Sequence, residues 1–395
     1  MGSIVKTILK HGGKVNGLSM HIPNDANNYS NNPTIANWNG RLVVNMRKNP
    51  YYLISLRNSD RVEFVTYGKD IYSFNTIGYL DNINKFKTLI PGPGPYKIMG
   101  KYTGMEDMRL VVWDNDLYGI LSRPDVVPNK VVMQLIRFNE MLDMVDTWVF
   151  ETPNYFEKNW LPIQDKPFNF LYDPATGACI ELNIANYKEA DDVVAPTIIN
   201  QINPPSFSGG LCGSSQVMPY KDGYICLCHS RYDWVDTYKH VYYTHQFVVY
   251  DKNMKPVSIS KPFNFFNKSV EYCCGLESDG ENIYITFSLH DGVCGMLTIP
   301  ISEFDSIIDY CFNNEMEDFS EEEVEDVIAS MFVDWGDNDK YVASLCYLTY
   351  RNEELIYNAI KEYKSDYHIW KPLILKQILK SKHDTPWLLK LIEKN

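Results

Sequence analysis

Positive charge is scarce in this chain of 395 residues. Lysine and arginine together number 37, against 50 aspartates and glutamates, so the formal net charge is −13. A protein with this balance has no basic face to neutralise phosphates, and we expect no non-specific nucleic-acid binding. A local basic pocket for one phosphate group remains compatible with the composition.

Long apolar runs are missing as well. No stretch approaches the roughly 20 residues that a membrane-spanning helix needs, and the apolar run within residues 1–14 is too short for a signal peptide. We therefore expect no membrane association and a soluble protein of the cytoplasm.

The nine cysteines do not have the arrangement of a disulfide framework. Cys226 and Cys228 are at strand spacing, Cys273 and Cys274 are adjacent, and neither pair has the Cys-x-x-Cys spacing of zinc sites. We expect small buried thiols in a reducing compartment. The sequence predicts no metal site and no cofactor.

What the chain does contain is a hairpin that occurs five times. Each copy is an apolar segment, a tight polar turn and a second strand rich in β-branched and aromatic residues, and such turns are strong hairpin signals because their residues reach positive φ at low cost. The turns are Asn39-Gly40, Asp114-Asn115-Asp116, Asp165-Lys166, Lys221-Asp222-Gly223 and Asp279-Gly280-Glu281.

The spacing of these hairpins indicates a radial fold. The copies start at residues 32, 106, 158, 213 and 271, roughly 50 to 75 residues apart, whereas known propeller repeats take about 40–50 residues for four strands. We predict an all-β protein with a five-bladed β-propeller over residues 1–315. The alternative is a β-sandwich of unrelated hairpins, which gives no reason for polar residues to precede each first strand.

The tail has a different character. Residues 316–395 contain carboxylates at a helix start near Ser320 and apolar residues at helical spacing within 353–360 and 370–379. We predict a small α-helical appendage of three or four helices. Its basic end, with Lys376, Lys380 and Lys382, is interpreted as a solvated helix face rather than a partner surface.

In a propeller the innermost strands surround an axial channel, so the polar residues that open each repeat converge at its mouth. Carboxylates there suit proton transfer and cations suit an anionic group, which is what glycosyl transfer requires. The candidates are Asn45, Arg47, Glu106, Asp107, Arg109, Lys158, Asn159, Ser214, His229, His245, Glu271 and Asp291.

Each candidate also has a purely structural interpretation. Asp107 stands inside an apolar strand, where an ionised group needs a partner or a role, and Arg109 on the same strand face would serve as a salt-bridge partner. His229 and His245 alternate with apolar residues in strands, as core histidines do. Asp291 also fits the cap of a turn.

Six motifs in this order resemble a known group of proteins. Gly104-Met105-Glu106-Asp107-Met108-Arg109 is similar to the Gly-x-Glu-Asp-Pro-Arg signature of five-bladed propeller mannoside phosphorylases and their glycosidase and mannosyltransferase relatives. The full order resembles more closely the propeller domains found alone or attached to bacterial glycosyltransferases. The other motifs are Asn32-Pro33-Thr34-Ile35, Glu157-Lys158-Asn159-Trp160-Leu161-Pro162, Gly213-Ser214-Ser215 with His229, Tyr243-Thr244-His245-Gln246-Phe247, and Glu271-Tyr272-Cys273-Cys274-Gly275-Leu276 with His290-Asp291.

The resemblance implies roles for the candidates. Asp107 would be the single general acid or base of an inverting mechanism. Phosphate or a sugar phosphate would bind Arg47, Arg109, Lys158 and His229, and sugar hydroxyls would bind Asn45, Asn159 and Asp291. The sequence departs from the pattern at Met108 in place of proline, at Leu211-Cys212 where an arginine often stands, and at His290 in place of asparagine.

Three functions follow from this pattern. The first is an enzyme that transfers a glycosyl residue such as mannose from a sugar-phosphate or nucleotide-sugar donor to a glycan acceptor. The second is a phosphorylase or hydrolase that acts on β-mannosides at the same site. The third is a non-catalytic propeller that binds glycans or proteins and has kept only the scaffold.

Overall fold

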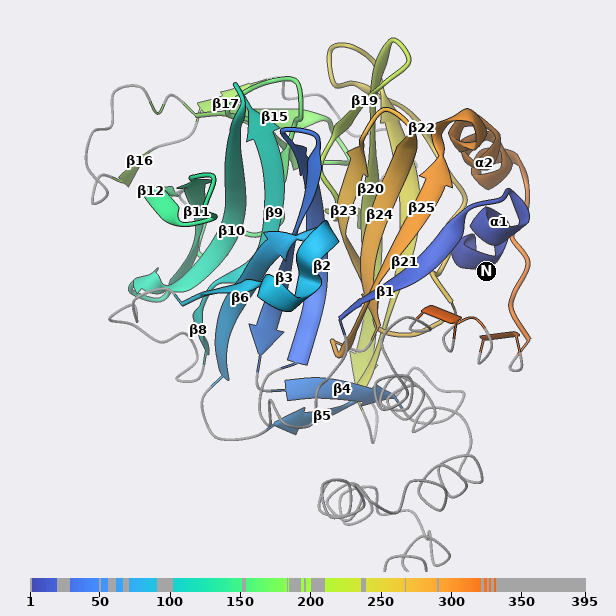
Figure 1. The fold of residues 1–395 in the computed structure, drawn as a ribbon, viewed down its shortest axis with the longest axis horizontal. Helices are drawn as coiled ribbons and strands as arrows, with labels where there is room; N and C mark the ends of the chain where they lie inside the picture. Colours follow the sequence, from blue (N-terminus) through green and yellow to red (C-terminus); the bar gives the residue numbers. More distant parts are fainter. Residues whose placement is uncertain are drawn as a thin grey trace, which may run out of the picture.

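The computed structural model describes residues 2–19, 29–49, 51–55, 62–66, 71–90, 102–150, 154–182, 184, 193–194, 197–199, 210–235, 239–266, 268–289 and 291–320, together with 323, 324, 327, 330 and 331. Within these residues, five sheets of four or five strands follow one another along the chain and form the blades of a propeller (Figure 1). The predicted fold is confirmed.

The first two blades contain the Glu-Asp motif and the strand that faces it. Blade 1 consists of β2 (Tyr29–Trp38), β3 (Arg41–Asn49), β6 (Ile71–Tyr79) and β7 (Lys87–Leu89), with β8 (Tyr102–Gly104) parallel to β6. Blade 2 consists of β9 (Glu106–Trp113), β10 (Asp116–Val127), β11 (Lys130–Phe138) and β12 (Met144–Phe150), with β16 (Val193–Val194) parallel to β12.

The remaining three blades complete the ring. Blade 3 consists of β13 (Leu161–Pro162), β14 (Asn169–Asp173), β15 (Ala178–Glu181) and β17 (Thr197–Ile199). Blade 4 consists of β18 (Cys212–Gly213), β19 (Met218–Tyr220), β20 (Gly223–Val235), β21 (Lys239–Tyr250) and β22 (Pro256–Ile259). Blade 5 consists of β23 (Glu271–Ser278), β24 (Asn282–Leu289), β25 (Val293–Pro300) and β1 (Lys14–Ser19).

The conformational preferences of the turn residues explain where the inner hairpins reverse direction. Asn39 and Gly40 have φ values of 54° and 74° between β2 and β3, and Asp114 and Asn115 have 51° and 69° between β9 and β10. Asparagine, aspartate and glycine tolerate this left-handed region, and the turns that use it match the twist of the flanking strands. The five predicted turns all connect the two innermost strands of a blade.

The hydrophobic core is divided into five clusters, and each lies between two neighbouring blades. Ile77 of blade 1 packs with Leu110 of blade 2, and Trp113 of blade 2 packs with Phe170 of blade 3. The other clusters join blades 3 and 4, blades 4 and 5, and blades 5 and 1. Because each sheet is buried on both faces by its neighbours, the arrangement is radial. A sandwich would have a single core between two sheets.

The N-terminal segment closes the ring. Strand β1 is antiparallel to β25, with Lys14 opposite Thr298 and Val15 opposite Leu297, so the last blade takes its outer strand from the start of the described chain (Figure 1). The sequence analysis did not predict this closure. Burial of the outer edge of β25 against β1 removes an exposed strand edge.

Two α-helices lie side by side on the outer edge of blade 5 (Figure 1). α1 (Ile4–Lys10) is capped by Ser3, whose side chain accepts a hydrogen bond from the Lys6 amide at 3.2 Å. α2 (Ile301–Asn313) follows β25 directly and buries Phe304, Ile307 and Ile308 in the core cluster that α1 shares with blades 4 and 5. α2 therefore lies inside the range 1–315 that the sequence assigned to strands of the propeller.

The predicted helical extension over residues 316–395 lies mostly outside the described residues. At its start, the Ser320 amide donates to Glu323 Oε2 at 2.7 Å and the Glu323 amide donates to Ser320 Oγ at 3.2 Å, a reciprocal pair typical of helix N-termini. None of the helices in the described part of the chain has the length and apolar character needed to cross a bilayer.

The first repeat is the longest because it carries additional elements. A hairpin of β4 (Tyr51–Ser55) and β5 (Val62–Thr66) separates β3 from β6, and a 3₁₀ helix η1 (Leu80–Lys85) follows β6. These additions explain the wide interval between the first and second repeats.

A buried glutamine joins the blades at the centre of the ring. Gln216 Nε2 donates to the carbonyl oxygens of Ile35 at 2.6 Å and Leu110 at 2.8 Å, and Gln216 Oε1 accepts from the Leu276 amide at 2.8 Å. These three partners belong to blades 1, 2 and 5, whereas Gln216 belongs to blade 4. Side chains therefore fill the axis here, and the polar site lies at one end of it.

Candidate functional site

The backbone around Glu106 and Asp107 has an unusual conformation. Gly104 has φ +97°, and a Cβ atom there would lie 2.0 Å from the Ser73 carbonyl oxygen, so this position requires glycine. The Gly104 amide donates to Asp125 Oδ2 at 3.0 Å, and Asp125 pairs with Arg123 at 2.7 Å. Asp107 itself has φ 52°. Neighbouring strands thus hold the turn that presents the two carboxylates.

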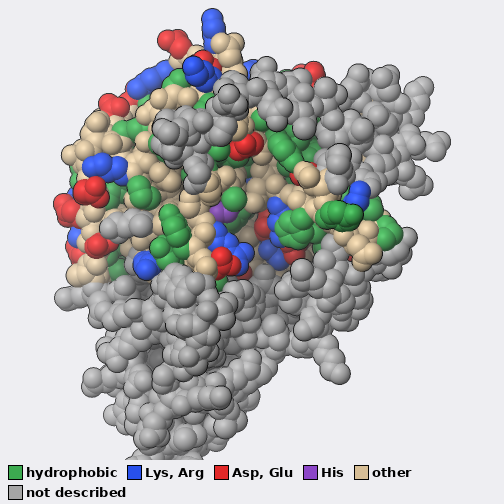
Figure 2. All heavy atoms as spheres, turned by 180° about the vertical axis from the view of Figure 1, so that it is seen from behind, with side chains coloured by type: hydrophobic (Ala, Val, Ile, Leu, Met, Phe, Trp, Pro, Cys, Tyr) green, Lys and Arg blue, Asp and Glu red, His purple; other side chains and the backbone are tan. Residues whose placement is uncertain are grey.

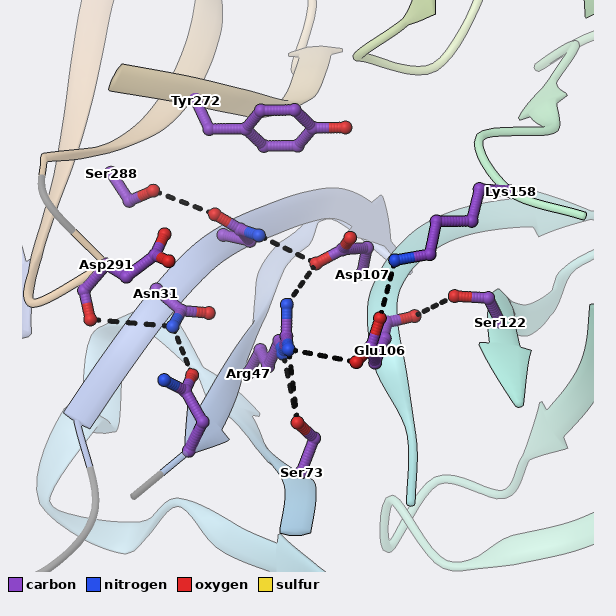
Figure 3. Close-up of polar contacts among 12 residues, drawn as sticks. Asn31, Arg47, Ser73, Glu106, Asp107, Ser122, Lys158, Tyr272, Ser288 and Asp291 are labelled. Carbon is purple, nitrogen blue, oxygen red and sulfur yellow. Dashed lines mark hydrogen bonds and ion pairs between the residues drawn. The ribbon is translucent and has the colours of Figure 1, made fainter. Parts of the chain in front are cut away.

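Asp107 is held by a cation and an amide through one of its two oxygens. Oδ1 accepts from Arg47 Nη1 at 3.0 Å and from Asn32 Nδ2 at 2.6 Å (Figure 3). Burial by itself would raise the pKa of Asp107, but the charges of Arg47 and Lys158 outweigh it and hold the pKa well below its ordinary value. Both hydrogen bonds of this carboxylate among the described residues are made by Oδ1, and Oδ2 has none among them.

Glu106 orients the two cations that flank Asp107. Its Oε1 accepts from Arg47 Nη2 at 3.2 Å and its Oε2 from Lys158 Nζ at 2.7 Å (Figure 3). Burial alone would raise the pKa of Glu106, but Lys158 and Arg47 hold it below its ordinary value. Arg47 is fixed further by Ser73 Oγ, which accepts from Nε at 3.3 Å. Glu106 is thus an ionised partner of these cations.

Arg109 is buried at the axis and joins four blades. Its guanidinium donates to Ser214 O (2.6 Å), Asp107 O (3.1 Å), Asn159 Oδ1 (3.0 Å), Tyr272 OH (3.2 Å) and Gly213 O (3.4 Å). The side chain is fully buried. Its contact with the Asp107 carbonyl fixes the backbone that presents the carboxylate.

His229 lies beside this arginine in a ring of polar and aromatic groups. Its Nδ1 is 2.8 Å from Ser214 Oγ, and its ring meets Tyr272 edge to face at 4.9 Å between centroids. Burial lowers the pKa of His229 to about 3, with Arg109 adding to the effect. The imidazole is therefore neutral at pH 7 and contributes a hydrogen-bonding group, without a charge, to the site.

Asp291 supplies a third carboxyl group from the end of β24. Figure 3 shows its side chain on the Asp107 side of the loop, and its carbonyl oxygen accepts from Asn31 Nδ2 at 3.5 Å. Burial raises the pKa of Asp291 to about 6, against the lowering effect of Arg47 and with a further rise from Asp107 and Glu106. Two aspartates near one another thus have opposite shifts in pKa.

The predicted residues Asn45 and Asn159 are placed within this network. Asn45 is fully buried, and its Nδ2 donates to Asn75 Oδ1 at 3.0 Å. Asn159, with φ 61°, accepts through Oδ1 from Arg109 and from Tyr272 OH at 3.1 Å. Both asparagines support the residues around them in the described structure.

Two other predicted residues lie deeper between blade 4 and the segment before β23. Glu271 accepts the amides of Phe265 at 2.5 Å and Phe266 at 2.9 Å. His245 packs against Phe263 and Phe265, and neither of its ring nitrogens has a partner among the described residues. Burial lowers the pKa of His245 well below its ordinary value. His290, which the motif comparison singled out, lies outside the described residues.

Two residues that the sequence analysis did not select take part in the site. Asn32 bridges Asp107 to blade 5, because its Oδ1 accepts from Ser288 Oγ at 2.8 Å. Tyr272 places its hydroxyl between Arg109 and Asn159. Each has a sequence signal that points to it: Asn32 opens the first repeat, and Tyr272 follows the polar residue that opens the fifth.

Charged side chains lie around a hollow on one face of the molecule. Figure 2 shows lysine, arginine, acidic and histidine side chains together near the middle of this face, with hydrophobic side chains beside them. Ligand sites in proteins are concave and combine a few polar groups with apolar walls. Among the described residues, no group of three or more His, Cys, Asp or Glu has the geometry to hold a metal ion.

Comparison with known proteins gives matches to solved structures only. No family model and no curated protein matches the sequence. Among solved structures, the chain is similar to a β-1,2-mannobiose phosphorylase from Listeria innocua, at 14% identity over 75% of this chain and 93% of that chain, with a TM-score of 0.46.

Two structures from Leishmania mexicana are similar at a comparable level. A mannose phosphorylase shares 12% identity over 76% of this chain and 92% of that chain, with a TM-score of 0.44. A GDP-Man-dependent mannosyltransferase shares 12% identity over 77% and 93%, also with a TM-score of 0.44. A mannose phosphorylase and a mannosyltransferase are among the kinds of protein that the motif Gly104-Met105-Glu106-Asp107-Met108-Arg109 resembles.

Proposed function

We propose that this protein transfers a glycosyl residue with inversion and that Asp107 is its single acid–base group. The function favoured is a glycosyltransferase that uses a sugar-phosphate or nucleotide-sugar donor and a glycan acceptor. The observation that carries the proposal is the buried Asp107 carboxylate among cations, bound through Oδ1 and with no hydrogen bond to Oδ2 among the described residues. The resemblance of the motif order suggests mannose as the sugar.

The ionised state of Asp107 supports a transferase over the other reactions. A phosphate-bearing leaving group is weakly basic and departs without protonation, so the enzyme needs only a base for the acceptor hydroxyl. Arg47 and Lys158 keep Asp107 ionised in the resting protein, with a pKa well below its ordinary value. Asp107 can therefore accept the acceptor's proton as the new glycosidic bond forms.

Asp291 favours a second candidate, a phosphorylase or hydrolase that acts on β-mannosides. Cleavage of a glycoside requires an acid for the leaving sugar oxygen. With a pKa raised to about 6 by burial, Asp291 holds a proton nearer to neutral pH than Asp107 does.

Replacement of Asp107 tests the catalytic assignment. Asp107→Asn keeps a residue that tolerates positive φ, so we expect a folded protein whose turnover of nucleotide sugars or mannose 1-phosphate falls by about 10²–10⁴-fold. Asp114→Asn is the matched control, because Asp114 has φ 51° and is exposed at the other end of β9. Equal turnover in the two variants would contradict the catalytic role of Asp107. No turnover by the unmutated protein, together with no ligand-induced stabilisation, would favour a non-catalytic propeller.

Ligand-induced thermal shifts separate the candidate reactions. A protein that binds a ligand only in its folded state melts at a higher temperature when the ligand is present. We expect stabilisation by GDP-mannose, UDP-sugars or mannose 1-phosphate. Stabilisation by inorganic phosphate together with a mannoside would favour a phosphorylase. No shift with any sugar ligand would contradict a carbohydrate site altogether.

A further inference from the structure

Two aromatic side chains are exposed on the segment between β12 and β13. Tyr155 is 75% exposed and Phe156 is 57% exposed, although most aromatic residues of the described chain are buried between blades. Such rings lose contact with water only when a partner or ligand covers them. They lie on the segment that leads to Lys158, next to the charged hollow.

The backbone of this segment is fixed at both sides of Phe156. The Val131 amide donates to the Tyr155 carbonyl at 2.9 Å, and the Glu157 amide donates to the Val131 carbonyl at 2.9 Å. The Glu157 side chain is buried and accepts from Trp160 Nε1 at 3.0 Å. The Phe156 ring is therefore presented from a hydrogen-bonded backbone at the edge of blade 2, and little further ordering is needed for binding.

The Phe156 ring lies close to the catalytic candidates. Lys158 Nζ is 5.1 Å from the centre of this ring and 2.7 Å from Glu106 Oε2. One lysine side chain thus separates the exposed aromatic face from the carboxylate next to Asp107. That spacing suits a ligand longer than one monosaccharide, with one sugar among the polar groups and the next against the ring.

Sugar chemistry fits this pair of environments. A pyranose has hydroxyl groups around its edge and a face of C–H groups, so it binds polar side chains at its rim and an aromatic ring at its face. At Asp107 the hollow offers charged and amide groups, and at Phe156 it offers an apolar face beside a cation.

We propose that Phe156 forms a second saccharide subsite, which holds the acceptor or leaving-group sugar next to the one that reacts at Asp107. The proposal rests on the proposed function, since it assigns a neighbouring sugar to that same site. Phe156 is in this role a specificity-determining residue, and it selects ligands of at least two sugar units.

The experiment compares a monosaccharide with a disaccharide in the full chain. Mannose and a β-linked mannobiose are titrated by calorimetry into the Asp107→Asn protein, which binds without turnover, and into the same protein with Phe156→Ala. We expect Phe156→Ala to weaken mannobiose binding about tenfold, as loss of an aromatic contact of about 1.4 kcal/mol would do, and to leave mannose binding unchanged.

Two further variants control for other roles of the ring. Phe156→Trp keeps an aromatic face and is expected to retain mannobiose affinity. Tyr155→Ala removes the neighbouring exposed aromatic ring, whereas the ring that Lys158 approaches is that of Phe156. This variant is expected to bind both sugars as the Asp107→Asn protein does.

Each other outcome overturns the subsite in a distinct way. An equal loss for mannose and mannobiose in Phe156→Ala would show that the ring acts by packing on Lys158. Unchanged binding of both sugars would show that the ring contacts no ligand, with the proposed function still standing. Failure of the Asp107→Asn protein to bind either sugar would overturn the assignment of mannosides to this site together with the subsite.

Discussion

Asp107 and Asp291 have the same backbone φ of 52°, but the pKa values of their side chains are shifted in opposite directions. Arg47 donates directly to Asp107, and this charge, with that of Lys158, outweighs burial and holds the pKa of Asp107 well below its ordinary value. Burial dominates for Asp291, and its pKa rises to about 6. Environments that push the pKa values of two carboxyl groups apart can assign them to different proton-transfer roles.

The raised pKa of Asp291 predicts a pH-dependent loss of stability. Below its unfolded pKa of about 3.9, the carboxyl is protonated in both states and has no effect. Between that value and about 6 the unfolded state loses its proton first, so stability falls as pH rises, and the full penalty is present above pH 6. Asp291→Asn should therefore stabilise the protein at pH 7.5 by about 1–2 kcal/mol, measured by urea unfolding.

The same variant should match the parent protein at pH 3.5, because both then carry a neutral side chain at this position. Asp114→Asn, at an exposed aspartate of similar φ, is the matched control for the substitution itself. A constant difference between Asp291→Asn and the parent at both pH values would contradict the raised pKa.

Single residues of the site were predictable where they open a repeat. Asp107, Arg47 and Lys158 were selected because the leading residues of radial repeats converge, and these three do form one network. The sequence could not reveal that His245 and Glu271 lie against phenylalanine-rich segments, because that depends on how residues 263–266 pack. Asn32 and Tyr272 stand at the start of repeats, but their contacts come from other blades, and their position in the repeat does not reveal which groups they meet.

At the scale of elements, the turn before β9 controls how the carboxylates are presented. Gly104→Ala would place a methyl group against the Ser73 carbonyl in a backbone conformation that alanine avoids. We expect a loss of at least about 2 kcal/mol in unfolding free energy together with reduced turnover, because the Glu106–Asp107 backbone must shift.

Gly40→Ala is the matched control for this element. Gly40 also has positive φ, at 74°, but a Cβ there would meet no atom within 4 Å. The Gly40→Ala protein should lose only about 1–2 kcal/mol of unfolding free energy, because alanine disfavours the left-handed conformation, and its turnover should be unchanged. A Gly104→Ala protein as stable and active as Gly40→Ala would show that the turn adapts without cost to the site.

Hairpins were the most predictable elements, because Asn-Gly and Asp-Gly turns act locally. The start of the fourth repeat at Gly213 was less predictable in detail, because the chain forms β18 and β19 there with Ser214, Ser215 and Gln216 between them. That interruption arises because Ser214 bonds to His229, Ser215 accepts from the Leu227 amide, and Gln216 bonds to other blades.

At the scale of the whole molecule, Gln216 is the residue that couples the blades. Gln216→Leu would leave two carbonyls and one amide of blades 1, 2 and 5 buried without partners, at about 1–3 kcal/mol each. We expect the unfolding free energy to fall by at least about 3 kcal/mol. In urea unfolding, the midpoint should be lower and the dependence of the free energy on urea concentration unchanged.

Gln164→Leu serves as the comparison, since Gln164 is only half-buried and donates to one carbonyl, that of Leu276, at 3.0 Å. The Gln164→Leu protein should lose about 1 kcal/mol of unfolding free energy. Similar losses in the two variants would mean that the contacts of Gln216 at the axis do not couple the blades.

The number of blades was predictable from five hairpins, but the closure of the ring was not. Strand β1 contains Asn16 and Gly17 and has no strict alternation of apolar residues, so only its pairing with β25 identifies it. Pairing between segments so far apart in sequence leaves no local signature, and it depends on the ring already being arranged.

The pairing of β1 with β25 also sets the order of events during biosynthesis. The ribosome makes β1 before it makes any blade, yet the partner of β1 emerges only after nearly the entire propeller has been translated. β1 must therefore wait without its partner strand until the other four blades have been made, and the ring closes only after β25 has emerged.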